Sequence, residues 1–222
     1  LRVEGGERIA LIGENGTGKT TLLNMLTGRE SCDGGSIRFG GRELSTLTPR
    51  ELSSTVGYLG HDPELSTDTV SENVLCGSEG DALPYLEVTA LKGEVLSMEN
   101  GADTIVGNNG VRLSGGQAQR LALARTLAHP RPLMILDDPF SALDRKTEDT
   151  VFANLQAYAK DKVVFLISHR LYHFPQTQKV IFMENGKATV GTHEELMRNE
   201  QGIYYGLVMA QRKMSSVKGK KN

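Results

Sequence analysis

The stretch that decides the fold is residues 13–20, which read Gly13-Glu14-Asn15-Gly16-Thr17-Gly18-Lys19-Thr20. It matches the pattern Gly-x-x-x-x-Gly-Lys-Ser/Thr of a phosphate-binding loop, or P-loop. The context is the required one, because residues 8–12 predict a strand before the loop and residues 19–26 predict a helix after it. Glycine-rich backbone N–H groups and a helix N-terminus together make an anion site. We therefore expect a nucleotide to be bound by the loop and the residue after it: Gly13, Glu14, Asn15, Gly16, Thr17, Gly18, Lys19, Thr20 and Thr21.

Two side chains of this loop have chemical roles of their own. Lys19 is expected to reach the β- and γ-phosphates of ATP, and the Thr20 hydroxyl is expected to ligate Mg²⁺. A glycine-rich turn with a Lys-Thr pair by coincidence is the alternative, and the strand and helix on either side argue against it.

A second chemical signal is the apolar strand predicted over residues 133–137, which ends in Asp137 and Asp138. In a parallel sheet the ligand sits at the carboxyl ends of the strands. Asp137 is then placed to hold Mg²⁺, and Asp138 to meet the water that attacks the γ-phosphate. Alone, this segment would be interpreted as a solvated Asp-Asp-Pro turn. Beside a P-loop, the catalytic interpretation is the better one.

The composition is that of an ordinary globular chain. Its 222 residues are 38% hydrophobic and 23% charged, with a net charge of −2, which gives no basic footprint for nucleic acid. Cys32 and Cys76 match no metal spacing and no disulfide framework. No apolar run approaches the roughly 18 residues of a membrane helix. The basic segment 215–222 is interpreted as a flexible tail.

Strand and helix patterns alternate along the chain, which predicts an α/β fold with a mostly parallel sheet. Further strands are predicted over 36–39, 56–59 and 163–168, a helix over 144–159, and a hairpin over 179–190. The hairpin turn is Asn185-Gly186, which favours type I′. Thr48 and Thr192 each begin a capping box at a helix start. Residues 70–128 carry mainly helical signals and are interpreted as an inserted helical subdomain.

The middle of the chain carries the family resemblance. Residues 113–117 read Leu-Ser-Gly-Gly-Gln ahead of a helix expected over 118–128, and residues 141–144 read Ser-Ala-Leu-Asp. His169 follows the strand expected over 163–168. In this order with the P-loop, these segments resemble the signature sequence, the D-loop and the switch histidine of ATP-binding cassette (ABC) proteins. The resemblance covers the chain from Leu1 to about Gln211.

The resemblance implies an architecture and a partner. The fold would be a P-loop NTPase core with an antiparallel β subdomain (residues 1–69), a helical signature subdomain (70–128) and a second core part (129–214). Two cassettes would face head to tail, and the signature of each would bind the γ-phosphate held by the other. The signature residues expected to act on the partner's ATP are Leu113, Ser114, Gly115, Gly116 and Gln117. His169 would contact the γ-phosphate in the chain's own site.

Several segments are similar to exporter cassettes, namely residues 104–110, residues 191–196 and the pair Tyr204-Tyr205. This similarity implies membrane-spanning domains on the same natural polypeptide and a location at the cytoplasmic face of the cell membrane. The chain begins with a strand-like segment, residues 1–3, which suggests a domain excised from a longer protein. The adenine-stacking aromatic residue of the family would precede that strand.

Two positions depart from the family pattern around the γ-phosphate. Asp138 stands where the family usually has Glu, and it is shorter by ~1.5 Å; a misplacement of about 1 Å can cost on the order of 100-fold in rate. His61 stands where the family usually has a Gln that reaches Mg²⁺. A neutral imidazole can still ligate the metal, whereas on its own His61 would be interpreted as a surface histidine. Together the two departures predict a degenerate site that hydrolyses ATP slowly, beside a different partner cassette with a competent site.

Three alternatives remain open at the level of sequence. The chain could be a regulatory ATP-binding clamp without turnover, or a fully active cassette that pairs with a second copy of itself. A DNA-repair or translation ATPase is disfavoured, because no long coiled coil, second cassette or basic linker is present.

Overall fold

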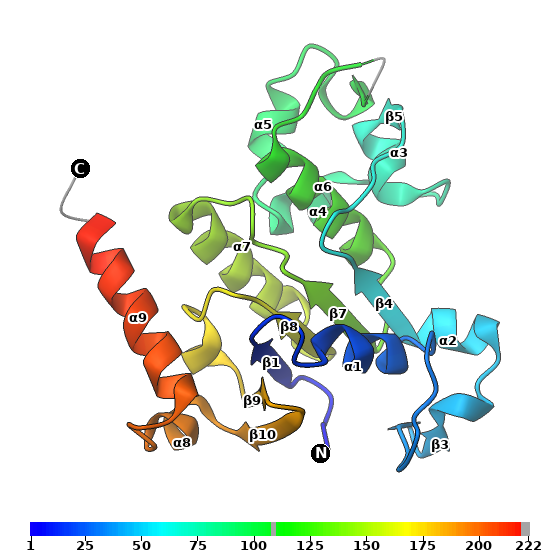
Figure 1. Ribbon diagram of the computed structural model, residues 1–222. Coiled ribbons are helices and arrows are strands. Elements are labelled where there is room, and N and C mark those ends of the chain that lie inside the picture. Colours follow the sequence, from blue (N-terminus) through cyan, green and yellow to red (C-terminus); the bar gives the residue numbers. More distant parts are fainter. Residues whose placement is uncertain (108–109, 219–222) are drawn as a thin grey trace.

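A mixed sheet forms the centre of the molecule (Figure 1). The computed structural model describes residues 1–107 and 110–218, with side chains up to Met214. In this part of the chain six strands hydrogen-bond in the order β10-β9-β1-β8-β7-β4. Every neighbouring pair is parallel except β9 and β10. The strands are β1 (Arg8–Gly13), β4 (Val56–Leu59), β7 (Leu133–Asp137), β8 (Val163–Ile167), β9 (Lys179–Glu184) and β10 (Lys187–Gly191). The predicted α/β class with a mostly parallel sheet is confirmed.

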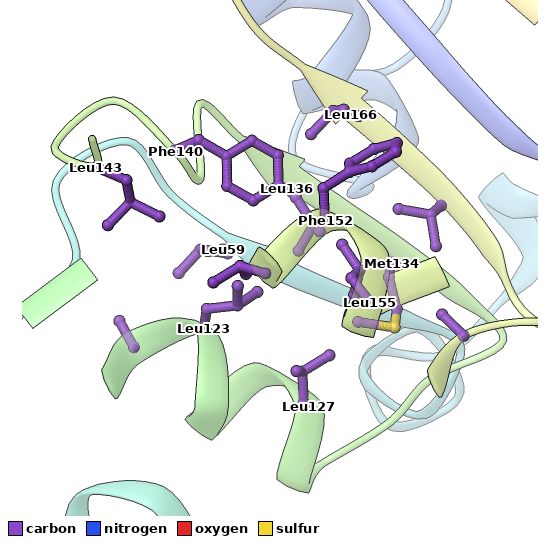
Figure 2. Packing of buried hydrophobic residues seen from close by; sticks show 14 residues of the cluster. Leu59, Leu123, Leu127, Met134, Leu136, Phe140, Leu143, Phe152, Leu155 and Leu166 are labelled. Atoms are coloured by element: carbon purple, nitrogen blue, oxygen red, sulfur yellow. The ribbon is translucent and has the colours of Figure 1, made fainter. Parts of the chain in front are cut away.

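The central strands are buried on both faces, as their continuous apolar runs predict. Alternate residues of each strand point to opposite faces. On one face, Ile9 and Ile135 pack with Leu23 and Leu26 of helix α1 (Lys19–Leu26). On the other face, Met134 and Leu136 of β7 pack against α6 and α7, a core that Figure 2 shows from close by. Helices α6 (Gly115–Ala128) and α7 (Arg145–Tyr158) both contribute leucines to this core.

A separate hydrophobic core lies among the helices between β4 and β7. It joins α3 (Val70–Leu75), α4 (Leu83–Val88) and α5 (Lys92–Leu96) to one side of α6. Figure 1 shows these elements together at the top of the view, away from most of the sheet. The short strands β5 (Asp68–Thr69) and β6 (Ile105–Val106) pair antiparallel there, beside the 3-10 helix η2 (Gly101–Asp103). Residues 108–109, which belong to the exporter-like segment 104–110, lie outside the described residues.

The region between α1 and β4 holds the other antiparallel pair, β2 (Arg38–Phe39) with β3 (Arg42–Glu43). The strand predicted over 36–39 is therefore half as long as expected. The 3-10 helix η1 (Leu44–Thr46) and helix α2 (Pro49–Thr55) follow. The predicted capping box of α2 is confirmed, because Thr48 Oγ1 accepts from the Glu51 N–H and Glu51 accepts from the Thr48 N–H. The segment 1–3, predicted to be strand-like, forms no strand and leaves Leu1 exposed.

The C-terminal part confirms two predictions and corrects one. Asn185 and Gly186 both have positive φ, 49° and 73°, as a type I′ turn requires, and Thr192 caps helix α8 (His193–Met197) in a capping box. The 3-10 helix η3 (Phe174–Gln176) lies upstream. The tail expected over 215–222 is helical as far as its fourth residue, because α9 (Ile203–Lys218) continues into it and no Gly or Pro interrupts residues 207–218. Residues 219–222 lie outside the described residues. None of the described helices has both the length and the apolar character that a bilayer-spanning segment needs.

Candidate functional site

Every predicted site residue outside the signature lies at the same edge of the sheet. Neighbouring parallel strands present their carboxyl ends together, and the strand order places β1, β8, β7 and β4 side by side. The P-loop follows β1, and the other candidates follow β8, β7 and β4: His169, Asp137 with Asp138, and His61. The parallel order alone therefore brings residues from four distant parts of the sequence to one place.

The P-loop is folded around its own lysine. The Lys19 ammonium donates to the carbonyl oxygens of Gly13 at 2.6 Å and Glu14 at 2.7 Å. Gly18 has φ 96° and precedes α1, and no described side chain caps that helix. The first backbone N–H groups of α1 are thus left for another acceptor, such as a phosphate. A Cβ at Gly13 would overlap the carbonyl oxygen of Met183, so only glycine fits there.

Lys19 and Asp137 form the charged centre of the site. Desolvation lowers the pKa of Lys19, and the nearby Asp137 carboxylate opposes that effect. Burial raises the pKa of Asp137 above its usual range, against the attraction of His61, and the neighbouring Asp138 carboxylate raises it further. The Tyr58 hydroxyl donates to Asp137 Oδ2 at 3.4 Å. A carboxylate with a raised pKa and a partly desolvated lysine both favour an incoming charged group that neutralises them.

Asp138 occupies an unusual backbone position. Its φ is 50°, a left-handed conformation that costs a non-glycine residue about 1 kcal/mol or more. The residue is 8% exposed. Its Oδ1 accepts from Ser168 Oγ at 3.4 Å, and its Oδ2 lies 4.0 Å from His61 Nδ1. The carboxylate therefore sits between the ends of β8 and β4.

The backbone of Asp138 is fixed from three sides. Its N–H donates to the Ile167 carbonyl at 2.9 Å, and its own carbonyl accepts from the Ser141 N–H at 3.1 Å and from Gln119 Nε2 at 3.4 Å. Because these partners belong to β8, to the D-loop and to α6, the Cα of Asp138 cannot shift without disturbing three elements.

The donor groups present fit Mg²⁺ bound together with a nucleotide. Mg²⁺ binds through one or two protein oxygens plus phosphates and waters. The exposed Thr20 hydroxyl and the Asp137 carboxylate are such oxygens. Within the described residues no three His, Cys, Asp or Glu side chains form a metal-binding cluster. The side chain of His61 is 56% exposed and faces the carboxylates.

The signature forms the first turn of α6. The helix predicted over 118–128 begins three residues earlier, at Gly115, because Ser114 and Gln117 close a capping box. Capping uses a lone pair of Ser114 Oγ, so the hydroxyl proton remains a donor. Gln117 Nε2 also donates to Glu94 Oε2 at 2.8 Å. Ser114 and Gly115 are exposed.

The loop after β8 is tied to the D-loop by one arginine. Arg170 donates to the carbonyl oxygens of Ser141 and Leu143, both at 2.8 Å, and to Glu148 Oε2 at 2.8 Å. His169 beside it is exposed. A cavity of about 290 Å³ separates His169 from the P-loop and is lined by Gly13, Glu14 and Asn15 on the loop side.

Comparison with known proteins identifies the family. A family model described as "ABC transporter" matches residues 1–141, more than half of the chain. The chain belongs to the ABC transporter family. It is 36% identical over 216 residues to ABC transporter B family member 1 of Dictyostelium discoideum, covering 95% of this chain and 24% of that protein. It is 39% identical over 204 residues to an ATP-dependent lipid A-core flippase of Burkholderia pseudomallei (strain 1710b), covering 90% and 34%.

A solved structure of a bacterial Atm1-family ABC exporter with ATP bound matches with a TM-score of 0.86 and 29% identity over 93% of this chain and 37% of that one. The ABC chain described here thus spans about a quarter to a third of the length of these relatives. It is an ABC transporter nucleotide-binding domain whose relatives include exporters.

Several residues of the site were not found by sequence reasoning. Tyr58, Gln119, Ser168 and Arg170 all contact the predicted residues or their loops. Ser168 and Arg170 flank His169, so their position beside the switch histidine was the available signal. No sequence signal pointed to Gln119, because Asp138, whose carbonyl it contacts, lies 19 residues away.

Proposed function

We propose that this chain is the nucleotide-driven motor domain of a membrane exporter. It binds Mg-ATP at the P-loop and pairs head to tail with a second cassette, and closure of that pair drives membrane-spanning domains. The similarity to a flippase and to an ABC exporter with ATP bound supports export. A cavity of about 490 Å³, lined by Leu65, Gly107 and Leu113 among others, adjoins the exporter-like segment 104–110. We infer that the membrane domains dock there, on the cytoplasmic side.

The chain's own residues account for ATP binding and for the reaction. Lys19 and the N–H groups of the P-loop stabilise charge on the phosphates. Thr20 and Asp137 would hold Mg²⁺, with His61 at the edge of the site, and the metal supplies neutralisation of the phosphate oxygens. Asp138 orients the attacking water and His169 contacts the γ-phosphate. Residues 113–117 bind the ATP that the partner cassette holds.

We further propose that hydrolysis at the chain's own site is slow, so that this is the degenerate half of an asymmetric pair. The single observation that carries this proposal is the fixed backbone of Asp138. Aspartate falls short of glutamate by ~1.5 Å, and the three backbone hydrogen bonds to β8, the D-loop and α6 prevent the main chain from moving forward to compensate. A shortfall of about 1 Å is worth on the order of 100-fold in rate.

The deciding experiment compares ATP turnover of the intact membrane complex as wild type and as Asp138→Ala, with ATP occupancy measured in parallel. We expect most of the turnover to persist while ATP stays bound, because catalysis would lie in the partner's site. A collapse of turnover would show that Asp138 is a working catalytic carboxylate and would favour a symmetric homodimer.

The substitution Asp138→Glu tests the degenerate-site argument against the alternative of a regulatory clamp without turnover. Asp138→Glu restores the missing length, so we expect it to raise hydrolysis at saturating ATP. No gain over wild type would contradict the degenerate-site argument. The clamp and the slow enzyme differ in the wild-type rate itself, which is zero for a clamp.

A further inference from the structure

The loop that carries His169 is held by the C-terminal helix as well as by the D-loop. Gln211 of α9 accepts a hydrogen bond from the Leu171 N–H at 2.9 Å, and its Nε2 donates to the His169 carbonyl. The two bonds flank Arg170. A backbone N–H can only donate and a carbonyl can only accept, so the orientation of the Gln211 amide is fixed by its partners. The Leu171 N–H and the His169 carbonyl require one acceptor and one donor, and the primary amide of Gln211 carries both on one planar group.

Helix α9 is itself fixed to the sheet. Tyr204 and Val208 are 3% and 4% exposed and share a hydrophobic core with Leu171 and with Ile12 of β1. The Tyr204 hydroxyl also lies 2.7 Å from His193 Nδ1 of α8. Tyr204, Val208 and Gln211 are spaced by four and three residues, which places them on one face of the helix. The helix that holds the His169 loop is therefore packed against the strand that leads into the P-loop.

The cavity between the P-loop and the His169 loop makes this geometry relevant to the site. Gln211 and Leu207 line it together with His169 on one side, and residues 13–15 line it on the other. Because the His169 side chain is exposed, its reach toward the P-loop depends on where its backbone is held. Gln211 bonds directly to the carbonyl of that residue.

We propose that Gln211 is a positioning residue, which sets the distance between His169 and the γ-phosphate of ATP bound in the P-loop. The inference rests on the proposed function, in which His169 contacts the γ-phosphate. In this role Gln211 acts through the backbone of residues 169–171, to which its amide is hydrogen-bonded. Through Gln211, helix α9 contributes to the discrimination between ATP and ADP.

The test measures the dissociation constants of Mg-ATP and Mg-ADP for the 222-residue chain by titration calorimetry. The variants are Gln211→Ala, Gln211→Glu, His169→Ala and the double variant, with Gln201→Ala, at an exposed glutamine just before α9, as the matched control. We expect Gln211→Ala to weaken ATP binding by roughly 3- to 10-fold, the range of one lost hydrogen bond, with ADP binding unchanged. Gln211→Glu keeps the acceptor for Leu171 and loses the donor for His169, so we expect a loss of the same kind.

The double variant separates positioning from a merely structural role. If Gln211 acts through His169, Gln211→Ala has no further effect once His169 is alanine. Equal weakening of ATP and ADP, or a full additive loss in the double variant, would overturn the inference. An unchanged ratio of ATP to ADP affinity in His169→Ala alone would instead refute the proposed contact of His169 with the γ-phosphate, and the role of Gln211 with it. If Gln211→Ala fails to fold, Gln211→Glu carries the same comparison.

Discussion

The clearest energetic prediction concerns Arg170, whose removal takes the guanidinium away from the buried Glu148 carboxylate and leaves that carboxylate facing the His173 ring, whose Nε2 lies 3.3 Å from Glu148 Oε1. Glu148 is 1% exposed and its Oε2 lies 2.8 Å from the Arg170 guanidinium. Removing one partner of a buried ion pair costs about 3–5 kcal/mol, because the remaining charge stays desolvated. The Arg170 side chain is 33% exposed, so water can enter after truncation and the lower end applies. We therefore expect Arg170→Met to cost about 3 kcal/mol of unfolding free energy, equivalent to roughly 6–12 °C in Tm for a domain of this size.

The assay is urea unfolding followed by circular dichroism, with a matched surface pair as the control. Arg2 and Glu4 lie at a similar distance, 2.7 Å, but their side chains are 89% and 65% exposed. Arg2→Met should therefore cost well under about 1 kcal/mol. Adding Glu148→Gln to Arg170→Met should recover part of the loss, since it removes the buried carboxylate charge that has lost its arginine. If Arg170→Met costs no more than Arg2→Met, or if Glu148→Gln brings no recovery, the reasoning from buried charge is refuted.

Two further predictions concern the signature and the metal site. Gly116→Ala would place a Cβ 3.0 Å from the Ala142 carbonyl oxygen, whereas the Cβ of Gly115→Ala meets only an ordinary contact at 3.7 Å. We expect Gly116→Ala to be less stable than Gly115→Ala by about 1 kcal/mol in urea unfolding. Equal stabilities would contradict the close packing at Gly116. The raised pKa of Asp137 means that its ionisation destabilises the folded state as pH rises through the interval between its unfolded and folded pKa values. Asp137→Asn should therefore raise Tm at neutral pH and lose that advantage below the ordinary Asp pKa. It should also abolish the Mg²⁺-dependence of ATP binding. A Tm gain that persists at low pH would rule out this electrostatic cause.

Local signals were enough to predict the α/β class with its mostly parallel sheet. The apolar strand ending at Asp137 and the P-loop after β1 are each a short continuous segment of sequence. The parallel strand order then places the P-loop and Asp137 at the same edge of the sheet. What could not be predicted are ties between residues far apart in sequence, such as Arg170 with Ser141 or Gln211 with His169. A hydrogen-bonding side chain carries no sequence mark of its partner, because its reach is decided by tertiary packing. The start of α6 was misplaced for a smaller reason: Gly115 and Gly116 disfavour a helix interior, and the capping box overrides them.

Helix α6 connects residues 113–117 to the carboxyl end of β7. Leu123 and Leu127 pack in the core against the sheet, while Leu121 and Ala124 pack in the core of the helical segment. A helix that is apolar on opposite sides is held by both layers, so it cannot rotate toward one without losing contacts in the other. The same helix donates through Gln119 to the carbonyl of Asp138. A shift of its first turn would therefore strain the hydrogen bond that Gln119 donates to the Asp138 backbone.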